Sequence, residues 1–108
     1  MAALLDRADP PDAVFCYSDL VASGAVHTAL RRGLRVPEDL AVIGYDDIED
    51  GRYGRPTIST ISPDKKAIAQ LAVDRLILRI GSTEPVPGME IRAAHQLVPR
   101  ESTLVTAR

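Results

Sequence analysis

The chain has 108 residues, of which 45% are hydrophobic and 26% are charged, with a net charge of −2 at pH 7. This composition is ordinary for a single globular domain, and the weak negative charge argues against a nucleic-acid-binding module, which usually has a basic surface. No stretch approaches the ~20 apolar residues of a membrane span, and the N-terminus lacks the long apolar centre of a secretory signal, so we expect a cytoplasmic protein.

Two apolar runs in the first half of the chain predict buried strands. A short helical fragment over 2–7 ends at the prolines of DPPD, and the run AVFCY (13–17) follows with the length and composition of a strand. The run LAVIGY (40–45) has the same character. Cys16 lies inside the first run, which predicts a buried thiol. As the only cysteine, it excludes an internal disulfide and a CxxC metal or redox motif.

The segment between these two runs predicts a helix. Ser18 and Asp19 are both good N-cap residues, and the apolar positions of 20–32 fall at helical spacing on one face. Two arginines close the segment, where they suit the negative end of the helix dipole, and Gly33 is a natural residue to end a helix. A strand, a helix and a second strand in this order predict a right-handed parallel crossover.

The middle of the chain predicts turns, a third strand and a second long helix. Residues 46–57 are rich in turn-forming residues, and ISTI (58–61) has the composition of a short strand. We expect Ser62 to cap the next helix, with Pro63 at its first position, where the missing N–H costs nothing. The helix itself is expected over 64–80, with a wide apolar stripe.

The last part of the chain predicts one or two strands, around 90–94 and 95–98. The order of the main elements is then strand, helix, strand, strand, helix, strand. Buried strands separated by helices are typical of an α/β fold, in which helices flank a parallel sheet.

Polar side chains stand at the point where each of the first two strands ends. Ser18 and Asp19 follow the first strand, while Tyr45, Asp46 and Asp47 close the second. Because parallel strands end at the same edge of a sheet, where ligands bind in such folds, we expect the two groups to lie side by side. A carboxylate there accepts hydrogen bonds from hydroxyl groups, which suits a sugar, a nucleoside or a similar polyol. Asp46 is the preferred candidate, whereas Asp19 alternatively caps its helix and Asp47 is expected to be a solvated turn residue.

A magnesium-dependent phosphoryl-transfer enzyme is the remote alternative, with Asp46 and Asp47 as metal ligands. The chain has no P-loop pattern and no glycine-rich phosphate cradle after a strand. His27 and His95 are not spaced as a metal pair, and Ser18 lacks the G-x-S-x-G context of a nucleophile. With no catalytic constellation in the sequence, we expect no enzymatic activity, no metal and no cofactor.

Three segments together resemble the C-terminal part of the LacI/GalR family of bacterial transcription regulators. They are PDAVFCYSDLVASGAVHTALRRGLRVPEDLAVIGYDD, RYGRPTISTI and LVPREST, and the resemblance runs over 4–104. It implies a partial C-terminal lobe of the type I periplasmic-binding-protein-like fold. It also implies a sensor for a sugar- or nucleoside-like effector and a homodimer, with operator DNA bound only through a helix-turn-helix domain that is not in this chain.

The resemblance assigns effector contacts to residues at the strand ends. Asp46, the first aspartate of GYDD, would contact the effector beside Tyr45. Ser18 holds the place that asparagine often occupies in the family, and Asp19 matches the aspartate that follows. Pro63 stands near the usual place of a glutamine, so this chain departs from two polar contacts that the family commonly makes.

The resemblance also implies a dimer interface. Ser23 and His27, on the helix that follows Asp19, and Arg52 and Tyr53, in RYGRP, would lie in it. An exposed aromatic residue such as Tyr53 is the kind of side chain that interfaces favour.

A last implication concerns domain organisation. In the family the chain crosses between lobes near TISPD, so 64–88 would belong to the other lobe of a full-length protein. We therefore expect a C-terminal fragment of an effector-binding and dimerisation domain, which self-associates through open strand edges and binds its effector weakly by itself. A sugar-binding component of a transport system shares the fold and is the alternative function. The sequence leaves open the identity of the effector and the choice between repression and activation.

Overall fold

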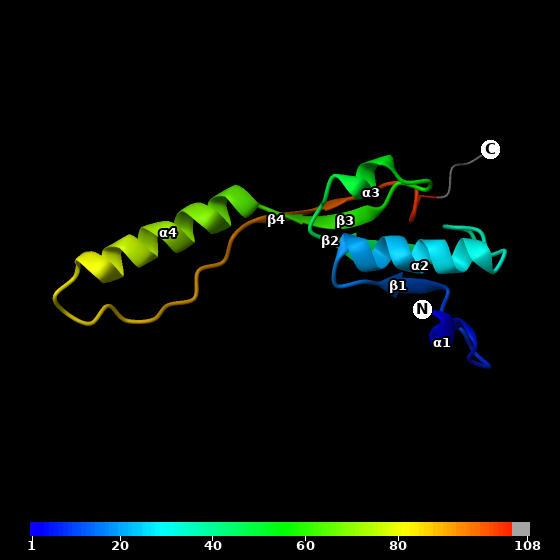
Figure 1. Ribbon diagram of the computed structural model, residues 1–108, viewed down its shortest axis with the longest axis horizontal. Coiled ribbons are helices and arrows are strands. Elements are labelled where there is room, and N and C mark those ends of the chain that lie inside the picture. Colours follow the sequence, from blue (N-terminus) through cyan, green and yellow to red (C-terminus); the bar gives the residue numbers. More distant parts are fainter. Residues whose placement is uncertain (105–108) are drawn as a thin grey trace. The chain divides into compact units, whose positions relative to one another are not determined.

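The computed structural model describes residues 1–104 and contains a four-stranded sheet in the order β1-β2-β3-β4 (Figure 1). The strands are β1 (Ala13–Phe15), β2 (Ala41–Tyr45), β3 (Ser59–Pro63) and β4 (His95–Val98). β2 lies parallel to both β1 and β3, with Ile43 paired with Phe15 on one side and with Ser59 on the other. The expected parallel arrangement is confirmed for these three strands, and the α/β class with it.

Four helices accompany the sheet in this part of the chain: α1 (Ala2–Leu5), α2 (Asp19–Arg31), α3 (Asp50–Tyr53) and α4 (Lys65–Gly81). α2 matches the helix expected over 20–32 to within one residue at each end. The Ser18 Oγ caps it by accepting a hydrogen bond from the Val21 N–H at 3.3 Å. Gly33 follows its end with φ +76°, a left-handed conformation that glycine adopts without a Cβ penalty.

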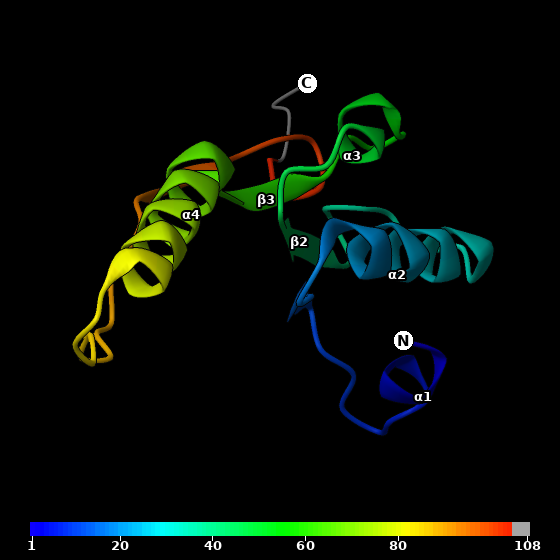
Figure 2. The same ribbon diagram turned by 60° about the vertical axis from the view of Figure 1, so that its left-hand side comes forward.

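The chain divides into two units, which are described separately. The first comprises Met1–Ser62 and the segment that begins at Gln96, and the second comprises Pro63–His95. In the first unit α2 packs against β2, and α3 lies beside α2 (Figure 2). The buried apolar side chains are Cys16, Ala22, Ala25, Val26, Ala29, Leu40, Val42 and Ile58. The small alanines let the helix approach the sheet closely, and each fully buried Leu or Val contributes about 1.5–3 kcal/mol.

β1 differs from the buried strand that its apolar run predicts. The strand ends at Phe15, which is 64% exposed, and Tyr17 beyond it is 79% exposed. β1 lies at one end of the strand order, so among residues 1–104 only its β2 side is paired. The expectation of full burial is wrong here because a run of apolar residues does not show which elements cover the strand. Only Cys16, together with the half-buried Val14, belongs to the core side.

Three local predictions differ from the structure. Residues 46–57 contain the short helix α3, which their turn-forming composition does not indicate. β3 continues through Pro63, and the cap of α4 is Asp64, whose Oδ1 accepts a hydrogen bond from the Ala67 N–H at 2.9 Å. Residues 90–94 form no strand. Pro63 therefore closes a strand instead of opening a helix.

The second unit consists of α4 and the loop that follows it. The apolar stripe expected over 64–80 is present in sequence, but no residue of α4 is buried, and Ile77 and Ile80 are 62% and 76% exposed. Arg75 Nη2 donates to the Pro87 carbonyl oxygen at 3.0 Å and joins the loop to the helix. No helix among residues 1–104 is both long and apolar enough to cross a membrane.

Candidate functional site

The ends of β1 and β2 lie at the same edge of the sheet. The two strands are parallel, and the Cys16 N–H donates to the Ile43 carbonyl oxygen at 2.8 Å just beyond the last paired residues. Ser18 and Asp19 therefore leave β1 beside the point where Asp46 leaves β2. The prediction that these polar groups emerge side by side is confirmed. We call Ser18, Asp19, Tyr45 and Asp46 the strand-end cluster.

Within this cluster Asp19 joins the start of α2 to the loop after β2. Its side chain is fully buried, and its Oδ2 accepts a hydrogen bond from the Ile48 N–H at 2.9 Å. The other oxygen, Oδ1, has no hydrogen-bond partner among residues 1–104 and rests against Gly44. Ser18, not Asp19, supplies the side-chain cap of the helix. A carboxylate in the first turn is nevertheless favourable, because it lies at the positive end of the helix dipole.

Asp46 stands where the chain turns sharply out of β2. It is half-buried and adopts φ 101°, and Asp47 after it adopts φ 50°. Aspartate tolerates this left-handed region better than most residues do. The Asp46 N–H donates to the Ile61 carbonyl oxygen at 3.0 Å. No side chain among residues 1–104 forms a hydrogen bond with the Asp46 carboxylate, which leaves this group available to a ligand.

Asp47 is the most heavily bonded carboxylate of the region. Its Oδ1 accepts from Arg100 Nη2 at 2.6 Å, and its Oδ2 accepts from Arg52 Nη2 at 3.0 Å and from Ser62 Oγ at 3.1 Å. Burial acts to raise the pKa of Asp47, but the hydrogen bonds from Arg100, Ser62 and Arg52 outweigh it and leave the pKa below its usual value. The Asp47 side chain is 12% exposed, so the expectation of a solvated turn residue is wrong.

We call Asp47, Arg52, Ser62 and Arg100 the Asp47 network, which the sequence does not reveal. Asp47 and Arg100 are 53 residues apart in the chain. The available signal is LVPREST, in which an arginine stands among small polar residues near a chain end. Ser62, expected to cap a helix, instead donates to Asp47. Both oxygens of Asp47 are therefore already engaged, and Asp47 is not free to hold a magnesium ion together with Asp46.

The residues expected at a dimer interface lie on two neighbouring helices. Ser23 and His27 are on α2, and Arg52 and Tyr53 are on α3. A hollow of about 150 Å³ separates α2 from the segment after α3. Its lining residues are Ser23, Val26, His27, Leu30, Gly54, Arg55, Pro56 and Ile58. Tyr53 is 76% exposed, whereas Arg52 turns its guanidinium toward Asp47.

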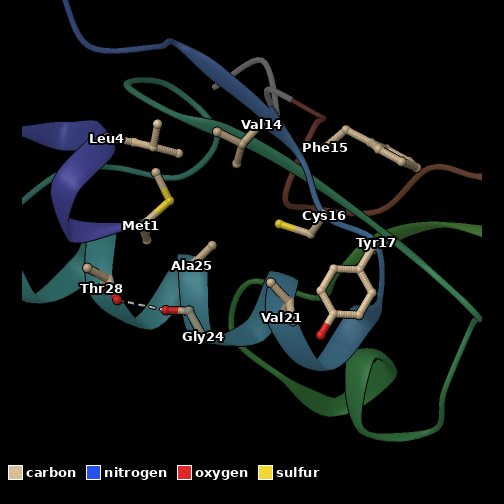
Figure 3. A pocket seen from close by; sticks show the side chains of 10 residues that line it. All are labelled: Met1, Leu4, Val14, Phe15, Cys16, Tyr17, Val21, Gly24, Ala25 and Thr28. Atoms are coloured by element: carbon tan, nitrogen blue, oxygen red, sulfur yellow. Dashed lines mark hydrogen bonds between the residues drawn. The ribbon is translucent and has the colours of Figure 1, made fainter. Parts of the chain in front are cut away.

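A second hollow is a groove of about 570 Å³ between α1, β1 and α2 (Figure 3). Its lining is largely apolar, with Val14 and Cys16 pointing toward α2 and Phe15 pointing away. The groove has two side-chain hydroxyls, those of Thr28 and Tyr17, and Thr28 Oγ1 already donates to the Gly24 carbonyl oxygen at 2.8 Å. The expected burial of Cys16 is confirmed, and burial raises the pKa of its thiol. This groove offers little to a polar ligand.

The described residues give no support for a metal site. Among residues 1–104, no group of three or more His, Cys, Asp or Glu side chains is placed to hold a metal ion. His27 and His95, whose spacing in the sequence does not suit a metal pair, are both exposed.

Both a family model and individual relatives match most of this chain. A family model described as a periplasmic binding protein-like domain matches residues 1–103. The ribose operon repressor of Haemophilus influenzae is 47% identical over 78 residues, which cover 72% of this chain and 24% of the repressor. The HTH-type transcriptional repressor PurR of Photorhabdus laumondii is 44% identical over 80 residues, which cover 74% of this chain and 24% of PurR. The chain therefore spans about a quarter of the length of these relatives.

Solved structures share the fold over nearly the whole chain. A transcriptional regulator of the LacI family from Sanguibacter keddieii superposes with a TM-score of 0.82 and is 40% identical, covering 94% of this chain and 39% of that one. The complex of the transcriptional regulator CelR with cellobiose gives a TM-score of 0.80 and 36% identity, covering 91% of this chain and 30% of that one.

Proposed function

The chain belongs to the family of periplasmic binding protein-like domains, in the form that LacI-type regulators carry, and from this we propose that it senses an effector and dimerises within a bacterial transcriptional regulator. The observation that carries the proposal is the parallel pairing of β1 and β2, which brings Ser18 and Asp46 to one edge of the sheet. Ligands of open parallel sheets bind at this edge. The relatives named as repressors favour this function over a transport component of the same fold.

The proposed effector is a polyol of the sugar or nucleoside class. Asp46 accepts hydroxyl hydrogen bonds from it, and Ser18 and Tyr45 add neutral polar contacts from the same edge. One solved relative is a cellobiose complex, which fits this chemistry. A charge-assisted hydrogen bond of this kind contributes about 1.5–3 kcal/mol. Asp19 supports the same site indirectly, because its hydrogen bond from the Ile48 N–H holds the loop that carries Asp46.

The proposed dimer surface is formed by α2 and α3. Ser23, His27 and Tyr53 are proposed to contact the partner subunit, whereas Arg52, also expected at the interface, turns its guanidinium toward Asp47. The exposed ring of Tyr53 supplies apolar area that a partner subunit covers. The partner proposed here is a second copy of the same chain.

The second unit is proposed to belong to the other lobe of the full-length regulator. Residues 64–88 lie within the separate unit Pro63–His95, and α4 has apolar side chains but no buried residue. A helix with so much exposed apolar surface needs a partner. Since the relatives are about four times as long as the matched region, the lobe and the DNA-binding domain would be supplied by sequence beyond this chain.

Calorimetric titration tests the proposal. The full reading frame that contains this chain is titrated with ribose, glucose, cellobiose and a set of nucleosides. At least one should bind, and Asp46→Asn should weaken that binding by about tenfold to a hundredfold, the equivalent of one charge-assisted hydrogen bond. Glu49→Gln is the matched control, because Glu49 is exposed in the same loop and its side chain does not cap α3. Equal binding by the wild type and Asp46→Asn would remove Asp46 from the site.

A further inference from the structure

The 46–47 turn is held from several elements at once. Main-chain N–H groups tie it to β3, since Asp46 donates to the Ile61 carbonyl oxygen at 3.0 Å and Asp47 donates to Thr60 Oγ1 at 3.3 Å. The Asp47 carboxylate is held by three donors, from α3, from β3 and from the segment after β4. These donors are Arg52, Ser62 and Arg100.

The conformation of the turn explains why so many contacts are useful. Both Asp46 and Asp47 have positive φ, a region that costs a non-glycine residue energy and persists only where the surroundings impose it. The contact between Asp47 and Arg100 is the shortest of the three to the carboxylate, at 2.6 Å, and the two side chains are only 12% and 16% exposed, so solvent screens it little. Arg100 is itself held by a bond from its Nη1 to the Ile58 carbonyl oxygen at 2.8 Å.

We infer that Asp47, held by Arg100, is a positioning residue for Asp46. The ion pair keeps the turn in its left-handed conformation and thereby sets the direction of the Asp46 carboxylate, which no side chain among residues 1–104 holds. The inference rests on the proposed function only for what Asp46 binds. The inference also gives the LVPREST segment a role at the proposed effector site, because its arginine, Arg100, acts on Asp46 through Asp47.

Amide hydrogen exchange, followed by NMR on the 108-residue chain, tests this without any ligand. The variant is Asp47→Asn, and the rates are corrected for intrinsic exchange. The Asp46 N–H should lose at least tenfold protection, while the Cys16 N–H, which donates to Ile43 at the same edge, should change by less than threefold. Equal loss at both amides, or no loss at either, would show a merely general effect on stability and overturn the inference.

Two further variants guard the result against general destabilisation. Asp39→Asn breaks the exposed ion pair with Arg35, which does not touch the turn, and should leave the ratio of Asp46 to Cys16 protection unchanged. Arg52→Gln removes only the more exposed of the two arginines and should give an intermediate loss at Asp46 even if Asp47→Asn does not fold. No selective loss at Asp46 in Arg52→Gln, with Asp47→Asn unfolded, would likewise count against the inference.

A double-mutant cycle then separates the effect of the Asp47–Arg100 interaction from the effects of replacing either residue alone. If Asp47 and Arg100 act as a unit, the double variant Asp47→Asn, Arg100→Gln should lose no more protection at the Asp46 N–H than the more affected of the two single variants. Additive losses would contradict a shared role. Failure of every sugar and nucleoside to bind the full regulator would refute the proposed function, while the exchange result would still decide the role of Asp47.

Discussion

Ser102 and Val42 exchange two hydrogen bonds although they lie 60 residues apart in the chain. The Ser102 Oγ donates to the Val42 carbonyl oxygen at 2.6 Å, and the Val42 N–H donates to the Ser102 carbonyl oxygen at 2.9 Å. The same Oγ accepts from the Ser59 N–H at 2.8 Å, and the Ser102 N–H donates to the Thr57 carbonyl oxygen at 2.9 Å. Ser102 thus fills the gap between β2 and β3 where the two strands are not paired with each other.

Replacing Ser102 by alanine should destabilise the chain by about 1–3 kcal/mol, because it leaves the buried Ser59 N–H without its acceptor. Chemical denaturation measures the difference. Ser82→Ala is the control, since within residues 1–104 that hydroxyl donates only to the Glu84 carbonyl oxygen two residues away. Equal changes in the free energy of unfolding for the two substitutions would mean that the hydrogen bonds of Ser102 contribute no more to stability than that of an exposed serine.

Gly44 and Gly24 should respond in opposite ways to alanine. A Cβ at Gly44 would collide with the Asp19 carboxylate and lie 2.9 Å from the Asp19 Cα, so Gly44→Ala should cost about 1–3 kcal/mol through overpacking. A Cβ at Gly24 meets nothing within 4 Å, and alanine inside α2 should gain about 0.5–1 kcal/mol. Thermal unfolding of the two variants compares them, and a shift of the melting temperature in the same direction would contradict the packing described.

Acid should weaken the loop before β2 through Asp39. The hydrogen bonds from Arg35, first from its side chain and then from its N–H, lower the pKa of Asp39 from 3.8 to about 2. Because the folded-state pKa is depressed, the stabilisation is complete above about pH 4 and is lost as the pH falls toward 2. The melting temperature of Asp39→Asn should therefore fall less between pH 5 and pH 2 than that of the wild type. Asp9→Asn, in the exposed DPPD loop, should follow the wild-type curve.

Tyr53 and Tyr17 provide a matched test of the dimer surface, because their exposed fractions are similar, 76% and 79%. In the full regulator, Tyr53→Ala should weaken dimerisation at least about tenfold, because tyrosine is enriched among the interface residues whose truncation costs most. Tyr17→Ala should leave it unchanged. Sedimentation velocity over a dilution series gives both dissociation constants, and the reverse ranking would move the interface from α3 to the β1 edge.

Local sequence patterns were sufficient for the main elements of the fold. Ser18 and Gly33 mark the two ends of α2, and its alanines mark the buried face. These are short-range signals, so α2 can be predicted to within a residue. The parallel pairing of β1 and β2 follows from one helix between two apolar runs. With that pairing, the meeting of Ser18 and Asp46 at one edge of the sheet is predictable as well.

Non-local contacts could not be predicted in the same way. The pairing of Asp47 with Arg100 depends on how the end of the chain returns to the sheet, which no spacing rule encodes. The exposure of Phe15 depends on which elements cover β1. At the start of α4, Ser62 is expected to cap the helix, whereas Asp64 does so, and local propensity does not decide between two residues that are both suited to capping.

The place of Ser102 between β2 and β3 has a consequence for biosynthesis. Because Ser102 supplies partners for Val42, Thr57 and Ser59, which precede it by 43 residues or more, the sheet stays incomplete on the ribosome until Ser102 has emerged. Closure of such a long loop is slow compared with local helix formation. A nascent chain arrested before this serine should therefore remain sensitive to protease, whereas one extended past it should become resistant.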